Sequence, residues 1–293
     1  SEVVRDYPTT WHKWEGVSSI TSKLKEDLGL VDGYLSAYAN AKDSPGKDEV
    51  GLSGSVVVMN FHNDSTAVVD EGATISIRPG SAGTWESALL GSDEDESVSW
   101  DAAVSVQALT DLTGAYAAGD IDIALKRNRG QQASASVGGS YAQVNYFVTT
   151  RATLAKNVVI GATGGGPAPD VSLGALTKER SFVIVPSAGG GATYGVVGNA
   201  GLTWLESDTI ASIEDGDVDA NGDARTRIDA GALKLAAEQE LLSFVVAGAV
   251  TAGENVGVGV GIGVQNVQTN TGVSVGRSLI TARSASIEAR TDG

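Results

Sequence analysis

The chain has 293 residues, no cysteine, and a formal net charge of −16 from 36 acidic and 20 basic residues. Disulfide frameworks and thiolate metal sites are therefore excluded, and the acidic balance argues against binding nucleic acid or anionic lipid. Apolar residues make up 42% of the chain, aromatic residues only 5%, and glycine is frequent at 38 residues. This composition favours a core of stacked Val, Ile and Ala, with glycine at the corners.

The first 50 residues differ from the rest and are predicted to form a helical capping or flanking segment. Residues 18–41 carry an apolar stripe at helical spacing, from Ile20 through Leu28 to Tyr38. Asp43 to Gly46 ends that helix. Because an open stack of strands exposes its edges, this helix could cover one end or lie along a flank.

Targeting signals are not visible in the chain. No apolar run is long enough to cross a bilayer, so we expect no direct membrane insertion. The segment from Ser1 to Trp14 lacks the apolar centre of a signal peptide. The chain is therefore expected to be an internal fragment or a processed product.

Residues 51–293 are predicted to be a repeat domain. The segment from Gly54 to Ile75 reads as strand, polar corner, strand, Glu-Gly turn and strand, and it returns from Gly139 to Ile160. A further copy runs from Gly198 to Val218, and weaker ones follow the same pattern. The copies are centred near Asn60, Gln107, Asn145, Trp204 and Asn266. Self-similarity on this scale is typical of a stacked array of strands.

A second pair of similar segments extends the repeating unit. Val171 to Leu202 resembles Ala232 to Val264 in its order of strands, charged corners and small-residue turns. For that reason Ala232 to Ala247 is interpreted as β-structure, although a helix also fits its composition. Val256 to Val264 alternates valine or isoleucine with glycine, which puts all glycines on one face. That face could approach another layer closely, face solvent or face a stack of small residues.

These repeats resemble the passenger repeats of very large bacterial filamentous adhesins, of the leukotoxin and filamentous-haemagglutinin-like types. The resemblance covers roughly Gly51 to Gly293, and Trp204 and Gln107 depart from it by standing where Asn is usual. The matching residues are Val58, Asn60, Thr66, Ala67, Val69, Gly72, Ala73 and Ile75 in the first copy, Asn145, Ala152, Leu154 and Ile160 in the third, Thr209, Ala211, Ile213 and Gly216 in the fourth, and Val245 to Ala249 and Val256 to Asn266 in the late part.

The resemblance implies a right-handed parallel β-helix, exported to the bacterial cell surface by an autotransporter or two-partner route. It implies adhesion, or a stalk or filament role, and it supplies no catalytic residues. We expect a rod that presents loops, such as Gly161 to Asp170 and Ser92 to Ser97, to a host, bacterial-surface, matrix or glycan ligand. The alternatives are a filament subunit that associates end to end and a β-helix carbohydrate-active enzyme.

The best ligand-like motif is acidic and lies between the last two copies. Its D-x-D-x-N-G order matches the first half of a calcium loop, but Ile228 stands where the loop's final Glu is usual. A plain Asx-Gly turn is the alternative. The candidate metal ligands are Asp215, Asp217, Asp219, Asn221 and Asp223.

No catalytic constellation or other cofactor is predicted. The only histidines, His12 and His62, lie in different elements and have no cysteine partner. The Gly-rich runs lack the G-K-[ST] of a phosphate loop. The tryptophans are widely spread and are interpreted mostly as packing residues. They are Trp11, Trp14, Trp85, Trp100 and Trp204.

Overall fold

The computed structural model describes residues 35–41, 50–78, 84–87, 98–101, 103–122, 135–191, 194–253 and 255–293. The chain divides into two compact units, Ser1–Tyr34 and Leu35–Gly293, and every described residue belongs to the second. All regular elements in the described ranges are β-strands. These ranges include no helix of the length and apolarity needed to cross a membrane.

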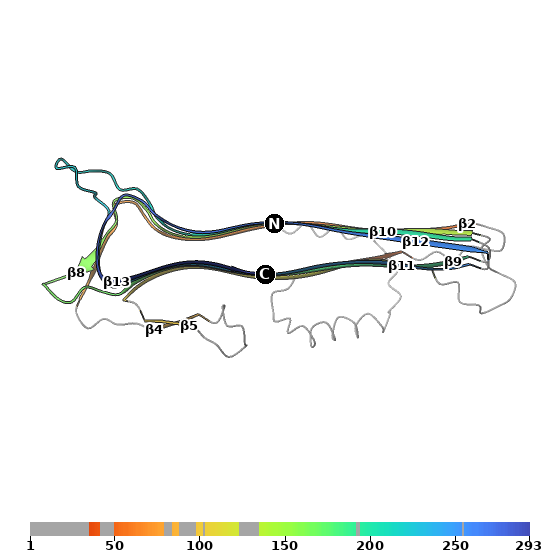
Figure 1. Ribbon diagram of the computed structural model, residues 1–293, viewed down its shortest axis with the longest axis horizontal. Coiled ribbons are helices and arrows are strands. Elements are labelled where there is room, and N and C mark those ends of the chain that lie inside the picture. The colour runs from red at the N-terminus through yellow and green to blue at the C-terminus, as the bar shows by residue number, and fades with distance from the viewer. Residues whose placement is uncertain are drawn as a thin grey trace, which may run out of the picture. The chain divides into compact units, whose positions relative to one another are not determined.

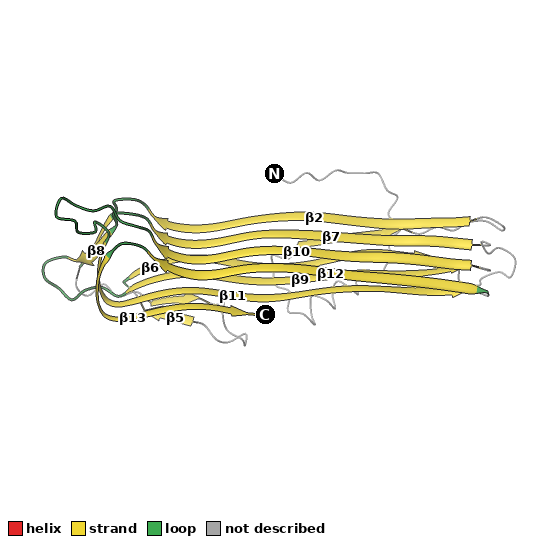
Figure 2. Ribbon diagram, turned by 45° about the horizontal axis from the view of Figure 1, so that its top comes forward, coloured by secondary structure: helices red, strands yellow, loops and turns green. Residues whose placement is uncertain are grey.

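Four long parallel strands form one sheet, in the order β12-β10-β7-β2 (Figure 2). They are β2 (Val50–Val69), β7 (Ala135–Leu154), β10 (Tyr194–Ile213) and β12 (Val256–Val275). Asn60 pairs with Asn145, Asn145 with Trp204, and Trp204 with Asn266. The prediction that these four segments occupy equivalent positions is therefore confirmed.

A seven-stranded sheet has the order β1-β6-β9-β11-β8-β3, with β13 also paired to β11, and all its pairs are parallel. Its strands are β1 (Leu35–Ala41), β3 (Thr74–Ile77), β6 (Val104–Asp122), β8 (Val159–Ala162), β9 (Val171–Gly191), β11 (Arg227–Gly253) and β13 (Leu279–Asp292). Two short strands, β4 (Thr84–Ser87) and β5 (Val98–Asp101), form a separate antiparallel hairpin with Trp85 opposite Trp100.

The chain alternates between the two large sheets, which lie as two layers (Figure 1). It runs from β2 to β3 and β6, returns to the four-stranded sheet at β7, and repeats this through β13. The first corner needs glycine, because Gly72 has a φ of 73°. The N–H of Gly72 donates to the carbonyl of Lys156 at 3.0 Å, so successive corners also bond to each other.

Side chains alternate inward and outward along β7 and β10, and the inward side chains of the two large sheets form two apolar clusters. One cluster lies near the corners and includes Leu154, Leu173 and Ile213. The other includes Tyr116 and Tyr146. Tyr146 donates a hydrogen bond of 2.8 Å to the hydroxyl of Tyr116. Buried tyrosines need such a partner because an unpaired hydroxyl would lose its bond to water.

A belt of polar side chains separates the two clusters. In the four-stranded sheet the belt runs through Thr150, Thr209 and Thr271, and in the seven-stranded sheet it includes Thr177 and Gln239. Thr209 donates to Thr177 at 2.7 Å, and Thr271 donates to Gln239 at 2.8 Å. Bonds between the sheets thus pair the threonine hydroxyls of the belt, whereas the amide nitrogen of Gln239 has no partner in the described part of the chain.

The glycines of the alternating Gly/Val segment lie on the side of β12 that faces β11, although they remain exposed to solvent. A Cβ at Gly259 would lie 3.1 Å from Ala249, and one at Gly261 would lie 2.8 Å from the carbonyl oxygen of Ala247. These positions allow β12 to approach β11 closely. The expectation that the glycine face allows close approach to another layer is therefore confirmed, and the nearest residues there, Ala247 and Ala249, are small.

Three sequence predictions about elements have a structural outcome. Ala232 to Ala247 lies within β11, so the prediction of β-structure from its similarity to the Val171 segment is confirmed. The prediction of helix at 35–41 was wrong, since these residues form β1 and pair with β6. Residues 18–34 lie outside the described residues.

The copy near Gln107 was misassigned, because Gln107 lies in β6 and pairs with Gly174 in the seven-stranded sheet. Strands of both sheets alternate similar small and apolar residues, so sequence similarity alone confused them.

Candidate functional site

The outward face of the four-stranded sheet is divided into an apolar and a polar half. Val56, 65% exposed, and Val260, 52% exposed, belong to the apolar half. The positions of this apolar face carry no charge, although the chain has a net charge of −16. They are Gly54, Val56 and Val58 on β2, Val137, Gly139, Tyr141 and Gln143 on β7, Tyr194, Val196, Gly198, Ala200 and Leu202 on β10, and Val256, Val258, Val260, Ile262 and Val264 on β12.

A furrow crosses this apolar face from strand to strand. Its floor is formed by Gly54, Gly139 and Gly198, which pair in register on β2, β7 and β10. A ridge runs beside the furrow and is formed by the next outward residue of each strand. The volume of the furrow is about 410 Å³. The ridge residues are Val56, Tyr141, Ala200 and Ile262. The three clearest copies of the repeat each begin with one of these glycines. This shared position is the sequence feature from which the furrow could have been predicted.

The row of Asn60, Asn145, Trp204 and Asn266 lies at the border between the two halves. Asn145 donates to Asn60 at 2.6 Å, and the amide of Gln143 donates to Asn145 at 3.3 Å. The hydroxyl of Tyr141 donates to Gln143 at 2.6 Å. Polar atoms on the apolar face are therefore paired with one another. Trp204 is 47% exposed, so it is an exception to the packing role expected for most of the tryptophans.

The polar half of the face holds the ionisable side chains. His62 stacks on Phe147 with ring centroids 5.2 Å apart, and Arg151 pairs with Asp208 at 3.7 Å. Glu206 lies on the same face of β10 as Asp208. Of these two carboxylates, Asp208 is thus already paired with Arg151. The alternative that the chain is a β-helix carbohydrate-active enzyme stays a prediction.

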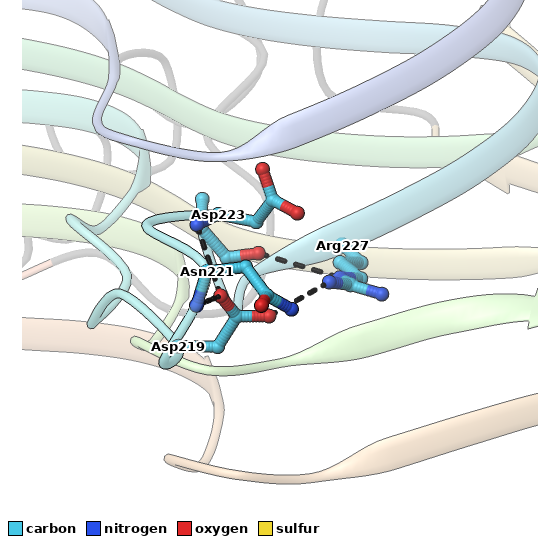
Figure 3. A network of polar contacts seen from close by, with 5 residues as sticks. Asp219, Asn221, Asp223 and Arg227 are labelled. Atoms are coloured by element: carbon cyan, nitrogen blue, oxygen red, sulfur yellow. Dashed lines mark hydrogen bonds and ion pairs between the residues drawn. The ribbon is translucent and has the colours of Figure 1, made fainter.

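The acidic corner between β10 and β11 is organised around Asp219 (Figure 3). Asp219 Oδ1 accepts hydrogen bonds from the backbone N–H groups of Asn221 at 2.8 Å and Asp223 at 3.0 Å. Its Oδ2 lies 3.5 Å from a guanidinium nitrogen of Arg227. These backbone bonds, with Arg227 contributing less, hold the pKa of Asp219 below its usual value. Gly222, with a φ of 85°, makes the turn possible.

Two of the other predicted calcium ligands, Asp215 and Asp217, contact neighbouring corners of the stack. Asp217 accepts a hydrogen bond of 2.8 Å from the Asn157 side chain, which is the main reason that its pKa is lowered. Asp215 Oδ1 accepts from the backbone N–H of Arg277 at 2.6 Å. Asp215, Asp217 and Asp219 therefore each accept hydrogen bonds from different partners.

The fit of calcium to this corner can be judged from these contacts. No group of three or more His, Asp or Glu side chains converges in the described parts of the chain. A cation at Asp219 would have to displace Arg227 from Oδ2. The arrangement fits the Asx-Gly turn alternative directly, and calcium stays a prediction.

Glu179 on β9 is a buried carboxyl that sequence reasoning missed, because its neighbours Lys178 and Arg180 suggested a solvated corner. It points inward and is 2% exposed. Oε1 accepts a hydrogen bond of 2.8 Å from Ser207 on β10, whereas Oε2 has no partner in the described part of the chain. Burial raises its pKa from the usual 4.5 to about 7, and the Ser207 hydrogen bond opposes this only in part.

Two loops at the corner side of the sheets are accessible. In Gly161 to Asp170, Thr163 to Gly165 are exposed, with left-handed φ values of 69° and 70° at Gly164 and Gly165. In the acidic corner, Asn221 to Asp223 are exposed. The other predicted contact loop, Ser92 to Ser97, lies outside the described residues.

Comparisons of the chain with protein-family models, curated proteins and solved structures find no match.

Proposed function

We propose that the chain is a segment of a right-handed parallel β-helix that serves as a structural and adhesive module of a large secreted bacterial surface protein. The observation that carries the proposal is the in-register row of Asn60, Asn145, Trp204 and Asn266. Each return of the chain adds one parallel strand to each sheet, so backbone hydrogen bonds continue from turn to turn. Such a stack is a stiff support, because its strands are bonded along the whole length of the sheet.

The adhesive part of the proposal depends on the loops at the corners. Thr163 to Gly165 and Pro167 in the first loop, and Asn221 to Asp223 in the acidic corner, are exposed, and both loops are held at their two ends by paired strands. Loops on a rigid support are suited to recognition because little further order is lost on binding. The partner is a host cell, a bacterial cell or a matrix component.

Adhesion is tested with beads that carry the purified chain. The beads are applied to epithelial cells, to bacterial cells and to plates coated with matrix proteins or glycans. Pro167→Ala and Asp223→Ala each change an exposed loop residue, whereas Ser274→Ala changes an exposed residue of β12 and serves as the control. We expect retention by at least one surface, weakened by a loop variant and unchanged by the control. Absence of retention on the entire panel would overturn the adhesive role.

A filament subunit is the second candidate. Its support is that no described strand pairs with the outer edge of β12 or β13. Unpaired strand edges favour addition of further strands from another molecule. Electron micrographs of the purified chain distinguish the two candidates, since regular fibres that lengthen with concentration favour the filament and discrete particles favour the module.

A further inference from the structure

We propose that the apolar face of the four-stranded sheet is the interface of a symmetric dimer, in which the ridge of each copy occupies the furrow of the other. This goes beyond the adhesive role, because it concerns a face away from the corner loops. The relevant features are the glycine floor at Gly54, Gly139 and Gly198 and the neighbouring ridge that contains Val56 and Tyr141.

On β2, β7 and β10 the ridge lies beside the glycine floor, and this makes that part of the face complementary to itself. On β12, Val260 stands in register with the glycines. A two-fold axis that lies between them and runs across the strands places each ridge over the partner's furrow. Tyr141 then lies opposite Gly139 of the second copy, and Val56 lies opposite Gly54 of the second copy. A single symmetry operation satisfies both contacts, as in other isologous interfaces. The strands of the two copies run in opposite directions across a face-to-face packing of sheets.

The size of the face suits a stable dimer. From Val256 to Val264 it extends about 30 Å along the strands, and the four strands span about 19 Å. The footprint is therefore roughly 550 Å², and the accessible area of a corrugated surface is larger than its footprint. A standard interface buries about 800 Å² on each partner. The flanking residues Trp204 and Asn145 would contribute the remaining area.

Charge also favours a second copy over a charged partner. No position of the apolar face carries a charge, so the face offers no ionic contact to a charged protein or to lipid headgroups. Two copies that meet at this face keep their acidic side chains, such as Asp64 and Asp208, in the polar half. Exposed apolar surfaces of this extent are typical of interaction sites.

The first test is the oligomeric state of the purified chain, measured by light scattering after size exclusion and by sedimentation velocity across a range of concentrations. We expect a dimer in the micromolar range. Val258→Lys places a charge twice in the symmetric interface and should leave a monomer. Gln268→Lys adds the same charge to the same face of β12 in its polar half, and Val246→Lys adds it to an exposed valine of the other sheet. Both controls should remain dimeric.

The second test distinguishes packing of the ridge into the furrow from non-specific association of apolar surfaces. Gly139→Val adds apolar surface, and its Cβ would meet the Gly198 carbonyl oxygen at 3.4 Å, an ordinary contact, so the fold is retained. The added side chain occupies the space of the partner's Tyr141, and we expect dimer affinity to fall about tenfold or more. Circular dichroism and thermal melting verify that each variant folds.

Several outcomes would overturn the proposal. They are a monomer at every concentration, a dimer that survives Val258→Lys, an open-ended polymer, or association strengthened by Gly139→Val. A chain that is monomeric in buffer but sediments with phosphatidylcholine vesicles would assign the face to lipid instead.

Discussion

Ser207 donates a hydrogen bond of 2.8 Å to Glu179 across the interior, joining β10 of one sheet to β9 of the other. The second oxygen of Glu179 has no partner in the described part of the chain. A buried carboxylate in this setting is costly when it is charged, and burial therefore raises its pKa to about 7. Burial of this carboxyl makes the stability of the fold depend on pH.

The first prediction concerns that dependence. The folded protein keeps the Glu179 proton up to about pH 7, whereas the unfolded chain releases it near 4.5. The folded state thus binds more protons in this window, and the contribution of Glu179 to the unfolding free energy falls as pH rises. The loss is about 1.4 kcal/mol per pH unit, or roughly 3 kcal/mol in total.

Glu179→Gln should remove this part of the pH dependence. Urea unfolding of the variant and the parent at pH 4.5, 6 and 8 measures the difference. Glu206→Gln, next to Ser207 on the outward face of β10, is the matched control and should leave the slope unchanged. Equal slopes for the parent and Glu179→Gln would show that the buried carboxyl does not titrate in this range.

The second prediction concerns Gly114 of β6, which leaves room for the tyrosine pair. A Cβ there would collide with the Tyr146 hydroxyl and approach Tyr116 to 2.7 Å. Gly114→Ala should therefore lower the unfolding free energy by about 1–3 kcal/mol. Adding Tyr146→Phe removes the colliding oxygen and should recover part of the loss. Gly248→Ala, on β11 of the other sheet, meets nothing within 4 Å and should be nearly neutral. Chemical denaturation of the three variants measures these effects, and a neutral Gly114→Ala would contradict the packing.

The third prediction concerns register and uses the absence of cysteine in the chain. Asn145 and Trp204 pair on neighbouring parallel strands, whose spacing of about 4.8 Å lies within the Cα range of disulfides. Asn145→Cys combined with Trp204→Cys should form an intrachain bond on mild oxidation, seen by free-thiol titration. Asn145→Cys with Leu205→Cys, one residue out of register and on the inward face, should not. Equal oxidation of both pairs would contradict the register.

The fourth prediction concerns calcium at the acidic corner. Arg227 lies against Asp219, so a cation must displace it. We expect millimolar calcium to change the melting temperature of the parent little and that of Arg227→Gln more, because the substitution frees a carboxylate oxygen. Lys234→Gln, elsewhere on β11, is the control for loss of a positive charge. A strong calcium response in the parent that Arg227→Gln leaves unchanged would mean that the cation binds elsewhere.

Much of the four-stranded sheet could be predicted from the sequence, because equivalent residues stack when parallel strands pair in register. Asn60, Asn145, Trp204 and Asn266 were aligned on sequence alone and proved to be neighbours. The same argument failed for Gln107, whose surroundings resemble theirs but whose strand belongs to the other sheet. Backbone pairing depends on which sheet a strand joins, and similar short motifs do not encode that choice.

Likewise, the period of two in a strand is enough to predict that Val256 to Val264 has an aliphatic face and a glycine face. Which of these faces meets β11 depends on how closely the two layers approach, and this is visible only in the folded chain, where the glycines face β11 and the valines face outward. The acidic corner follows the same rule. Its composition was visible in the sequence, but the partners of Asp215 and Asp217 come from neighbouring corners some sixty residues away, brought close by the stacking of the sheets.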